Sequence, residues 1–129
     1  MAVQYVVRPK INPLKPTEPK KWYAIAKSTG EITLRKLGQE ITVRCTVNFA
    51  DTLAVLEALT QVLTERLDEG KIVRFGDFGT FRITIGSDSA ETAEKFHSSM
   101  ITSKKVAFRP GVDIKELLNN LKYEKSPSN

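Results

Sequence analysis

The residues best placed for chemistry are basic side chains in the second half of the chain. Arg82 lies in TFRITI (80–85), which alternates between apolar and polar residues as a half-buried strand does. Lys104, Lys105 and Arg109 lie in a stretch that is predicted to return as a second strand. Cations aligned along one surface bind the phosphates of a polyanion, because each contact releases a condensed counterion. If the two strands pair, we expect these cations to converge on one phosphate-binding surface.

Each of these residues also has an ordinary structural interpretation. Arg82 and Lys105 suit routine solvent-facing strand positions, and the stem of Arg109 can cover apolar surface. Gly79 and Thr80 lie at the start of the predicted ribbon, where backbone amides can approach a phosphate because glycine has no side chain in the way. The phosphate-binding hypothesis therefore depends on how the strands pair.

Length, charge and targeting signals limit the class of protein. A chain of 129 residues suits one compact domain with an appendage. The net charge of +5 is uneven, since residues 1–30 carry six Lys and Arg against one acid, which suggests an acidic partner such as nucleic acid. No apolar run approaches the roughly 20 residues of a membrane helix, and the first residues lack a secretory signal. We therefore expect a cytoplasmic protein without a membrane partner.

The sequence contains no recognisable catalytic constellation. His97 is the single histidine, and Cys45, the single cysteine, is expected to be a buried, inert thiol. No glycine-rich phosphate loop, H-x-E motif or nucleophile elbow is present. We predict that the protein is not an enzyme and needs no metal, cofactor or small-molecule substrate.

The expected elements place the cations on a ribbon that follows two helices. The long helix is apolar on most sides, so a second subunit is expected to cover it. Gly70 should end this helix, and Thr46 is the residue expected to cap its start. In chain order we predict a strand hairpin over 3–7 and 20–27, helices over 33–44 and 47–68, strands over 71–75, 80–85 and 100–108, and a last helix opened by a capping box from Asp113 to Glu116.

Two motifs in this order carry a family resemblance. Gly76-Asp77-Phe78-Gly79-Thr80-Phe81 follows the long helix, and Phe108-Arg109-Pro110-Gly111 precedes the last one. Together with the helix pair, they resemble the bacterial histone-like HU/IHF DNA-binding proteins over roughly residues 32–122. The resemblance implies an α+β fold and an intertwined homodimer, with a helical base, a β-saddle and protruding β-arms that reach round double-stranded DNA.

The resemblance also assigns roles and boundaries. It implies that Lys104, Arg109 and Lys115 face DNA, whereas Lys95 and Lys105 are proposed from their location alone. We expect an N-terminal β-hairpin extension over 1–30, as in longer HU-like variants, an HU/IHF-like domain over 31–125 with its arm at about 82–107, and a disordered tail over 126–129.

One departure from the family concerns the arm tip. The Arg-Asn-Pro whose proline wedges between base pairs is replaced by SDSAETAEKFHSSM, and Phe96 and Met100 are the apolar wedge candidates that remain. The arm is therefore expected to be short or partly helical at its end, and sharp kinking of DNA is not expected.

Two hypotheses for function follow. In the first, the chain is an architectural, largely sequence-independent DNA-binding protein of the bacterial nucleoid that compacts or gently bends duplex DNA as a homodimer. In the second, it is a protein-interaction module on an HU-like fold with weak or lost DNA binding. The N-terminal lysines leave a choice of the same kind, since they can extend the DNA footprint or keep an edge strand from aggregating.

Overall fold

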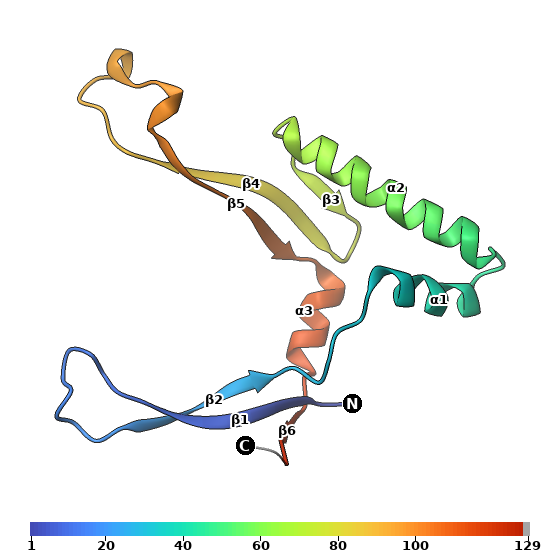
Figure 1. Ribbon diagram of the computed structural model, residues 1–129, viewed down its shortest axis with the longest axis horizontal. Helices are drawn as coiled ribbons and strands as arrows, with labels where there is room; N and C mark the ends of the chain where they lie inside the picture. Colours follow the sequence, from blue (N-terminus) through green and yellow to red (C-terminus); the bar gives the residue numbers. More distant parts are fainter. Residues whose placement is uncertain (128–129) are drawn as a thin grey trace. The chain divides into compact units, whose positions relative to one another are not determined.

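The structure, a computed structural model, describes residues 1–127, which form a mixed α+β chain with three α-helices and two three-stranded sheets (Figure 1). Contacts divide the chain into two compact units. One unit combines Met1–Thr33 with the segment from Leu118 onward, and the other is Leu34–Leu117. No helix within residues 1–127 has the length and apolar character needed to cross a membrane.

The N-terminal unit is a sheet of strand order β2-β1-β6. Strands β1 (Val3–Lys10) and β2 (Lys21–Lys27) form the expected antiparallel hairpin, which closes around the proline-rich loop. A proline cannot donate to a central ladder, and three of them, Pro13, Pro16 and Pro19, lie in this loop. The fourth, Pro9, lies in β1 beyond the residues that pair with β6. The third strand, β6 (Tyr123–Lys125), joins β1 in parallel and is distant from it in the sequence.

Strand β6 corrects two sequence-based boundaries. The chain from Leu118 groups with the N-terminal hairpin, although 31–125 was expected to be one domain. Ser126 was expected in a disordered tail, but it is buried and donates its backbone N–H to the carbonyl of Tyr5 at 2.8 Å. This bond extends the pairing of β6 with β1 by one residue. The remaining part of that prediction, residues 128–129, lies outside the described residues.

In the second unit, helices α1 (Leu34–Arg44) and α2 (Phe49–Asp68) pack together. Asn48, and not Thr46, caps α2, because its side-chain oxygen accepts the N–H of Asp51 at 2.8 Å. Cys45, which was expected to be buried, directly follows α1 and is exposed in the single chain. At the other end of α2, Gly70 adopts φ 79°, a left-handed conformation that glycine allows at low cost.

The second sheet carries the predicted ribbon. Strand β3 (Val73–Phe75) pairs with the start of β4 (Gly79–Ser87), which pairs along its length with β5 (Ile101–Pro110). Beyond Phe81, β4 and β5 continue as two strands only, with an irregularity between Gly86 and Ser87 (Figure 1). Two short 3₁₀ turns, Ala93–Lys95 and Ser98–Met100, lie in the segment between β4 and β5, which we call the tip.

The glycine-punctuated turn holds the last helix in place. Helix α3 (Val112–Asn119) begins one residue before the predicted cap, Asp113. Two backbone bonds tie its start to the turn: the N–H of Gly111 donates to Phe78 at 2.9 Å, and the N–H of Asp113 donates to Asp77 at 3.0 Å. The rings of Phe78 and Phe81 both pack on Phe108, with centroid distances of 5.7 and 4.9 Å. The two sequence motifs thus meet at one structural joint.

Gly79 is required at this joint, and its replacement gives a direct test. A Cβ at Gly79 would overlap the ring of Phe108 and come within 2.7 Å of the Arg109 carbonyl oxygen. We expect Gly79→Ala to lower the free energy of unfolding by about 1–3 kcal/mol, the usual cost of overpacking. Gly86→Ala on the same strand is the matched control, since its Cβ would meet the Ser103 hydroxyl, which can rotate away. Equal denaturant midpoints for the two variants would contradict this assignment.

Candidate nucleic-acid interface

One face of the β3-β4-β5 sheet is basic and polar. Because directly paired residues share a face, the register places Thr80 beside Arg109, Arg82 beside Ala107 and Thr84 beside Lys105. Strand β3 adds a fourth cation, since Arg74 pairs with Thr80. We call this surface the ribbon basic face; its cations are Arg74, Arg82, Lys105 and Arg109.

The four cations of the ribbon basic face are available to a ligand. All four are exposed, and none forms an ion pair within the described chain. No Asp or Glu occurs in β3, β4 or β5, so no carboxylate on these strands offsets the positive charge. Lys105 and Arg109 are four residues apart on β5, about 13 Å along the strand, and Arg82 and Arg74 lie on β4 and β3 beside it. Such an array can bind a row of phosphates.

The opposite face of the same sheet is apolar. It carries Val73, Phe75, Phe81, Ile83, Ile85, Val106 and Phe108. Several of these side chains remain open in the single chain, for example Ile85 at 63% and Val106 at 54% exposure. The sheet is therefore two-sided, with one face suited to phosphates and the other to a hydrophobic partner surface.

Lys104 lies on the apolar face, not with the other ribbon cations. It pairs with Ile85 and lies on the same face of β5 as Val106 and Phe108. The register therefore places Arg82, Lys105 and Arg109 on one face of the sheet and Lys104 on the other. The physical reason is the alternation of a strand, which sends adjacent lysines to opposite faces.

The remaining predicted contact residues fall in different places. Lys115 is exposed in α3, one turn after the joint at Gly111. Lys95 lies in the tip, where its ammonium pairs with Glu91 at 3.3 Å. Thr80 is on the ribbon basic face between Arg74 and Arg109.

The structure gives Gly79 a role other than the expected one. Gly79 is buried, and the space that a side chain would take is filled by Phe108. The glycine therefore permits close packing inside the sheet, whereas the sequence suggested a close approach of its backbone to a phosphate.

Arg74 is the ribbon cation that sequence reasoning missed. The alternation of the strand could have identified it. Val73 and Phe75, on either side of Arg74, are apolar, so Arg74 is expected to point to the opposite, polar face. The same alternation applies to β5, where Lys104 lies on the face of Val106 and Phe108, and Lys105 lies on the opposite face with Arg82.

The tip between the strands differs in charge from the ribbon. Asp88, Glu91 and Glu94 lie there with a single Lys95 that is already paired with Glu91. Phe96 is 39% exposed and Met100 is half-buried, so Phe96 is the more accessible of the two apolar candidates. Within residues 1–127, no group of three or more His, Cys, Asp and Glu side chains could hold a metal ion.

Comparisons with known proteins agree with this architecture. A crystal structure from Bacteroides vulgatus, described as a "Putative bacterial DNA binding protein", superposes with a TM-score of 0.65 and 12% sequence identity over 98% of this chain. The chain spans 50% of that structure's length, and the likeness establishes the fold. A search of curated proteins gave no match.

The family comparison covers both units of the structure. The HU-HIG family, described as an HU domain fused to wHTH, Ig, or Glycine-rich motif, matches residues 1–125. The match includes the helix pair, the ribbon, and the N-terminal hairpin with its third strand. The chain therefore belongs to the HU-HIG family.

Proposed function

We propose that this protein is an architectural, largely sequence-independent DNA-binding protein that acts as a homodimer in the cytoplasm, at the bacterial nucleoid. The observation that carries the proposal is the ribbon basic face, with four exposed cations and no carboxylate on its strands. Backbone phosphates are a ligand that matches several exposed cations on one face of a sheet. Membership of a family built on the HU domain supports DNA as the polyanion, as does the shared fold of the Bacteroides vulgatus DNA-binding protein.

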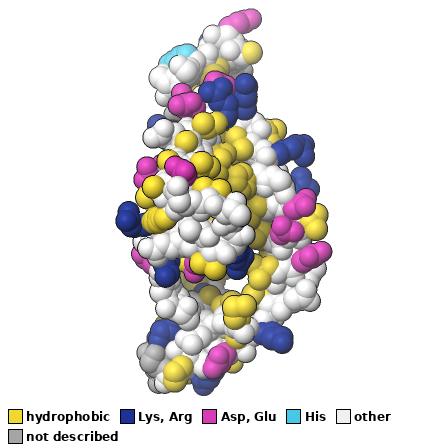
Figure 2. Space-filling view, turned by 90° about the vertical axis from the view of Figure 1, so that its right-hand side faces the viewer, with side chains coloured by type: hydrophobic (Ala, Val, Ile, Leu, Met, Phe, Trp, Pro, Cys, Tyr) yellow, Lys and Arg dark blue, Asp and Glu magenta, His cyan; other side chains and the backbone are white. Residues whose placement is uncertain are grey.

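The homodimer is proposed from the lack of a core in the single chain. Among residues 1–127 no hydrophobic residue is fully buried, although 40% of the sequence is hydrophobic. Figure 2 shows hydrophobic side chains open on the surface of one chain. On α2, Val55 is 65% and Val62 is 50% exposed. These two valines are seven residues apart and so lie on the same side of the helix. Intertwining with a second copy would cover these side chains and form the missing core.

Salt dependence of duplex binding tests the proposed function. If each dimer neutralises about 6–8 phosphates, the logarithm of the binding constant should fall against the logarithm of salt with a slope near −6. The measurement is fluorescence anisotropy with a labelled duplex at several salt concentrations, repeated with unrelated sequences. A slope near zero, or binding restricted to one sequence, would contradict phosphate-led binding.

Two adjacent lysines give a sharper test of which face binds. Lys105 is on the ribbon basic face, and Lys104 is on the opposite, apolar face. We expect Lys105→Ala to reduce the magnitude of the salt slope by about 2 for a dimer, since about 0.9 is lost per phosphate contact on each chain. Lys104→Ala should leave the slope nearly unchanged. The reverse result would show that the apolar side of the ribbon faces DNA.

A protein-interaction module remains a second candidate, and the acidic tip favours it. Asp88, Glu91 and Glu94 would repel phosphates, and no proline is present there to wedge between bases. This candidate predicts duplex binding only at very low salt, so the salt titration separates it from the first.

A further inference from the structure

A second cationic surface lies on the N-terminal sheet. The β1–β2 register pairs Arg8 with Tyr23 and Lys10 with Lys21. Each pair shares one face, and the two pairs are adjacent on that face because Arg8 and Lys10 are two residues apart. We call this surface the N-terminal basic face; it consists of Arg8, Lys10, Lys21 and Tyr23.

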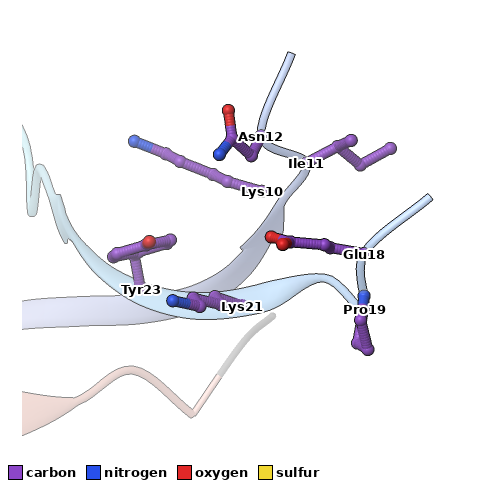
Figure 3. A pocket seen from close by; sticks show the side chains of 7 residues that line it. All are labelled: Lys10, Ile11, Asn12, Glu18, Pro19, Lys21 and Tyr23. Carbon is purple, nitrogen blue, oxygen red and sulfur yellow. The ribbon is translucent and has the colours of Figure 1, made fainter. Parts of the chain in front are cut away.

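The three cations of the N-terminal basic face lack carboxylate partners. None of them forms an ion pair in the part of the chain that the structure describes. Glu18 borders the same pocket as Lys10 and Lys21 (Figure 3). The lysine that it pairs with is Lys15, at 3.5 Å. Like charges directly opposite on paired strands destabilise a sheet, and Lys10 and Lys21 have this arrangement. An anion bound between them would remove that repulsion.

An aromatic ring lies among these cations. Tyr23 is 47% exposed, and the Nζ atom of Lys10 lies 5.5 Å from its ring centroid. Figure 3 shows the side chains of Lys10 and Lys21 next to this ring. The neighbouring Trp22 pairs with Pro9 and points to the opposite face, where it joins Tyr5, Val7, Ala24 and Ala26. At the loop end of the hairpin, one face of the sheet is thus cationic and aromatic, and on the same face Val6 pairs with Ile25 next to Arg8 and Tyr23.

We propose that the N-terminal basic face binds single-stranded nucleic acid. Arg8, Lys10 and Lys21 contact phosphates of one strand, and a base stacks on Tyr23. A single strand presents unpaired bases and phosphates side by side, which is what an exposed ring flanked by cations can bind. In a duplex the bases are already stacked on their neighbours, so a duplex would use the cations and leave the ring without a partner.

This inference goes beyond the proposed function. Its residues belong to Met1–Thr33, whereas those of the ribbon basic face belong to Leu34–Leu117. The two surfaces therefore make separate predictions: substitutions on the ribbon should act on duplex binding, and substitutions on the N-terminal basic face should act on single-strand binding.

The adjacent residues Tyr23 and Trp22 provide a matched test in the full-length protein. We expect Tyr23→Ala to weaken binding of a short oligothymidine strand by about tenfold, the usual contribution of one stacked base. Tyr23→Phe should retain the affinity, because the ring and not the hydroxyl does the stacking. Trp22→Ala, on the opposite face, should have no effect on binding. Anisotropy of the labelled strand measures all three, and circular dichroism confirms that each variant is folded.

A charge variant completes the test. Replacing Arg8, Lys10 and Lys21 together by Ala should reduce the magnitude of the single-strand salt slope by about 2, since each phosphate contact on a single strand contributes about 0.7. Duplex binding by the ribbon should persist in this variant. Unchanged single-strand affinity, or unchanged affinity with increased aggregation, would overturn the proposal and assign the lysines to edge protection. Equal losses for Trp22→Ala and Tyr23→Ala would also overturn it.

Discussion

Reversing the charge of Arg82, Lys105 and Arg109 together is expected to abolish detectable duplex binding at moderate salt. The three side chains share the ribbon basic face, and the proposed dimer would present them twice. Removing about six phosphate contacts should weaken binding by about three orders of magnitude or more, and equally for all sequences. Anisotropy titrations of the variant against two unrelated duplexes provide the measurement. A loss confined to one sequence would indicate base readout.

A control of equal charge change separates local contacts from net charge. Lys15, Arg44 and Lys122 are exposed and lie outside both basic faces. Reversing all three changes the total charge by the same amount but removes no residue of either basic face. If this control loses as much duplex affinity as the ribbon variant, long-range attraction accounts for binding and the ribbon basic face does not.

Val55→Asp and Val62→Asp are expected to disrupt the protein far more than their exposure in one chain suggests. An exposed valine on an isolated monomer tolerates aspartate within about 0.5 kcal/mol. In the proposed dimer the same carboxylate would be buried without a partner, at a cost of several kcal/mol, about 3–5 by analogy with a broken buried ion pair. We expect each variant to elute as a monomer or to unfold, and to lose the concentration dependence of the melting temperature.

Thr64→Asp is the matched control on the same helix. Thr64 is β-branched like valine, is exposed, and lies two residues after Val62, on the other side of α2. It should elute as the wild-type protein does in size-exclusion chromatography. If both valine variants also behave as the wild-type protein does, α2 is not at a subunit interface and the homodimer proposal is wrong.

Local signals in the sequence predicted much of the fold. The apolar pattern of α2, the glycine at its end and the alternation in TFRITI act over a few residues, so their elements were predicted close to the observed bounds. The start of α2 was predicted two residues early, because Thr46 and Asn48 are both good caps and only Asn48 reaches the N–H of Asp51.

Features that depend on pairing between residues far apart in the sequence could not be predicted. Strand β6 is three residues long and has no alternating pattern, so its pairing with β1 could not be inferred from local sequence. The candidate site depended on register in the same way. Parity within β5 separates Lys104 from Lys105, but the pairing of β3 with β4 is needed to bring Arg74 beside Thr80. Without the strand register, the sequence-based set of cations therefore combined residues from both faces of the sheet.

The pairing of β1 with β6 also has a consequence for the order of events during synthesis. Val3 pairs with Tyr123, so the sheet joins residues that are far apart in the sequence. While the ribosome is still making the segment between them, the β1–β2 hairpin lacks its third strand, and an isolated hairpin is at best marginally stable in water. Completion of this sheet therefore waits until β6 has left the ribosome, and the nascent chain carries an open strand edge until then.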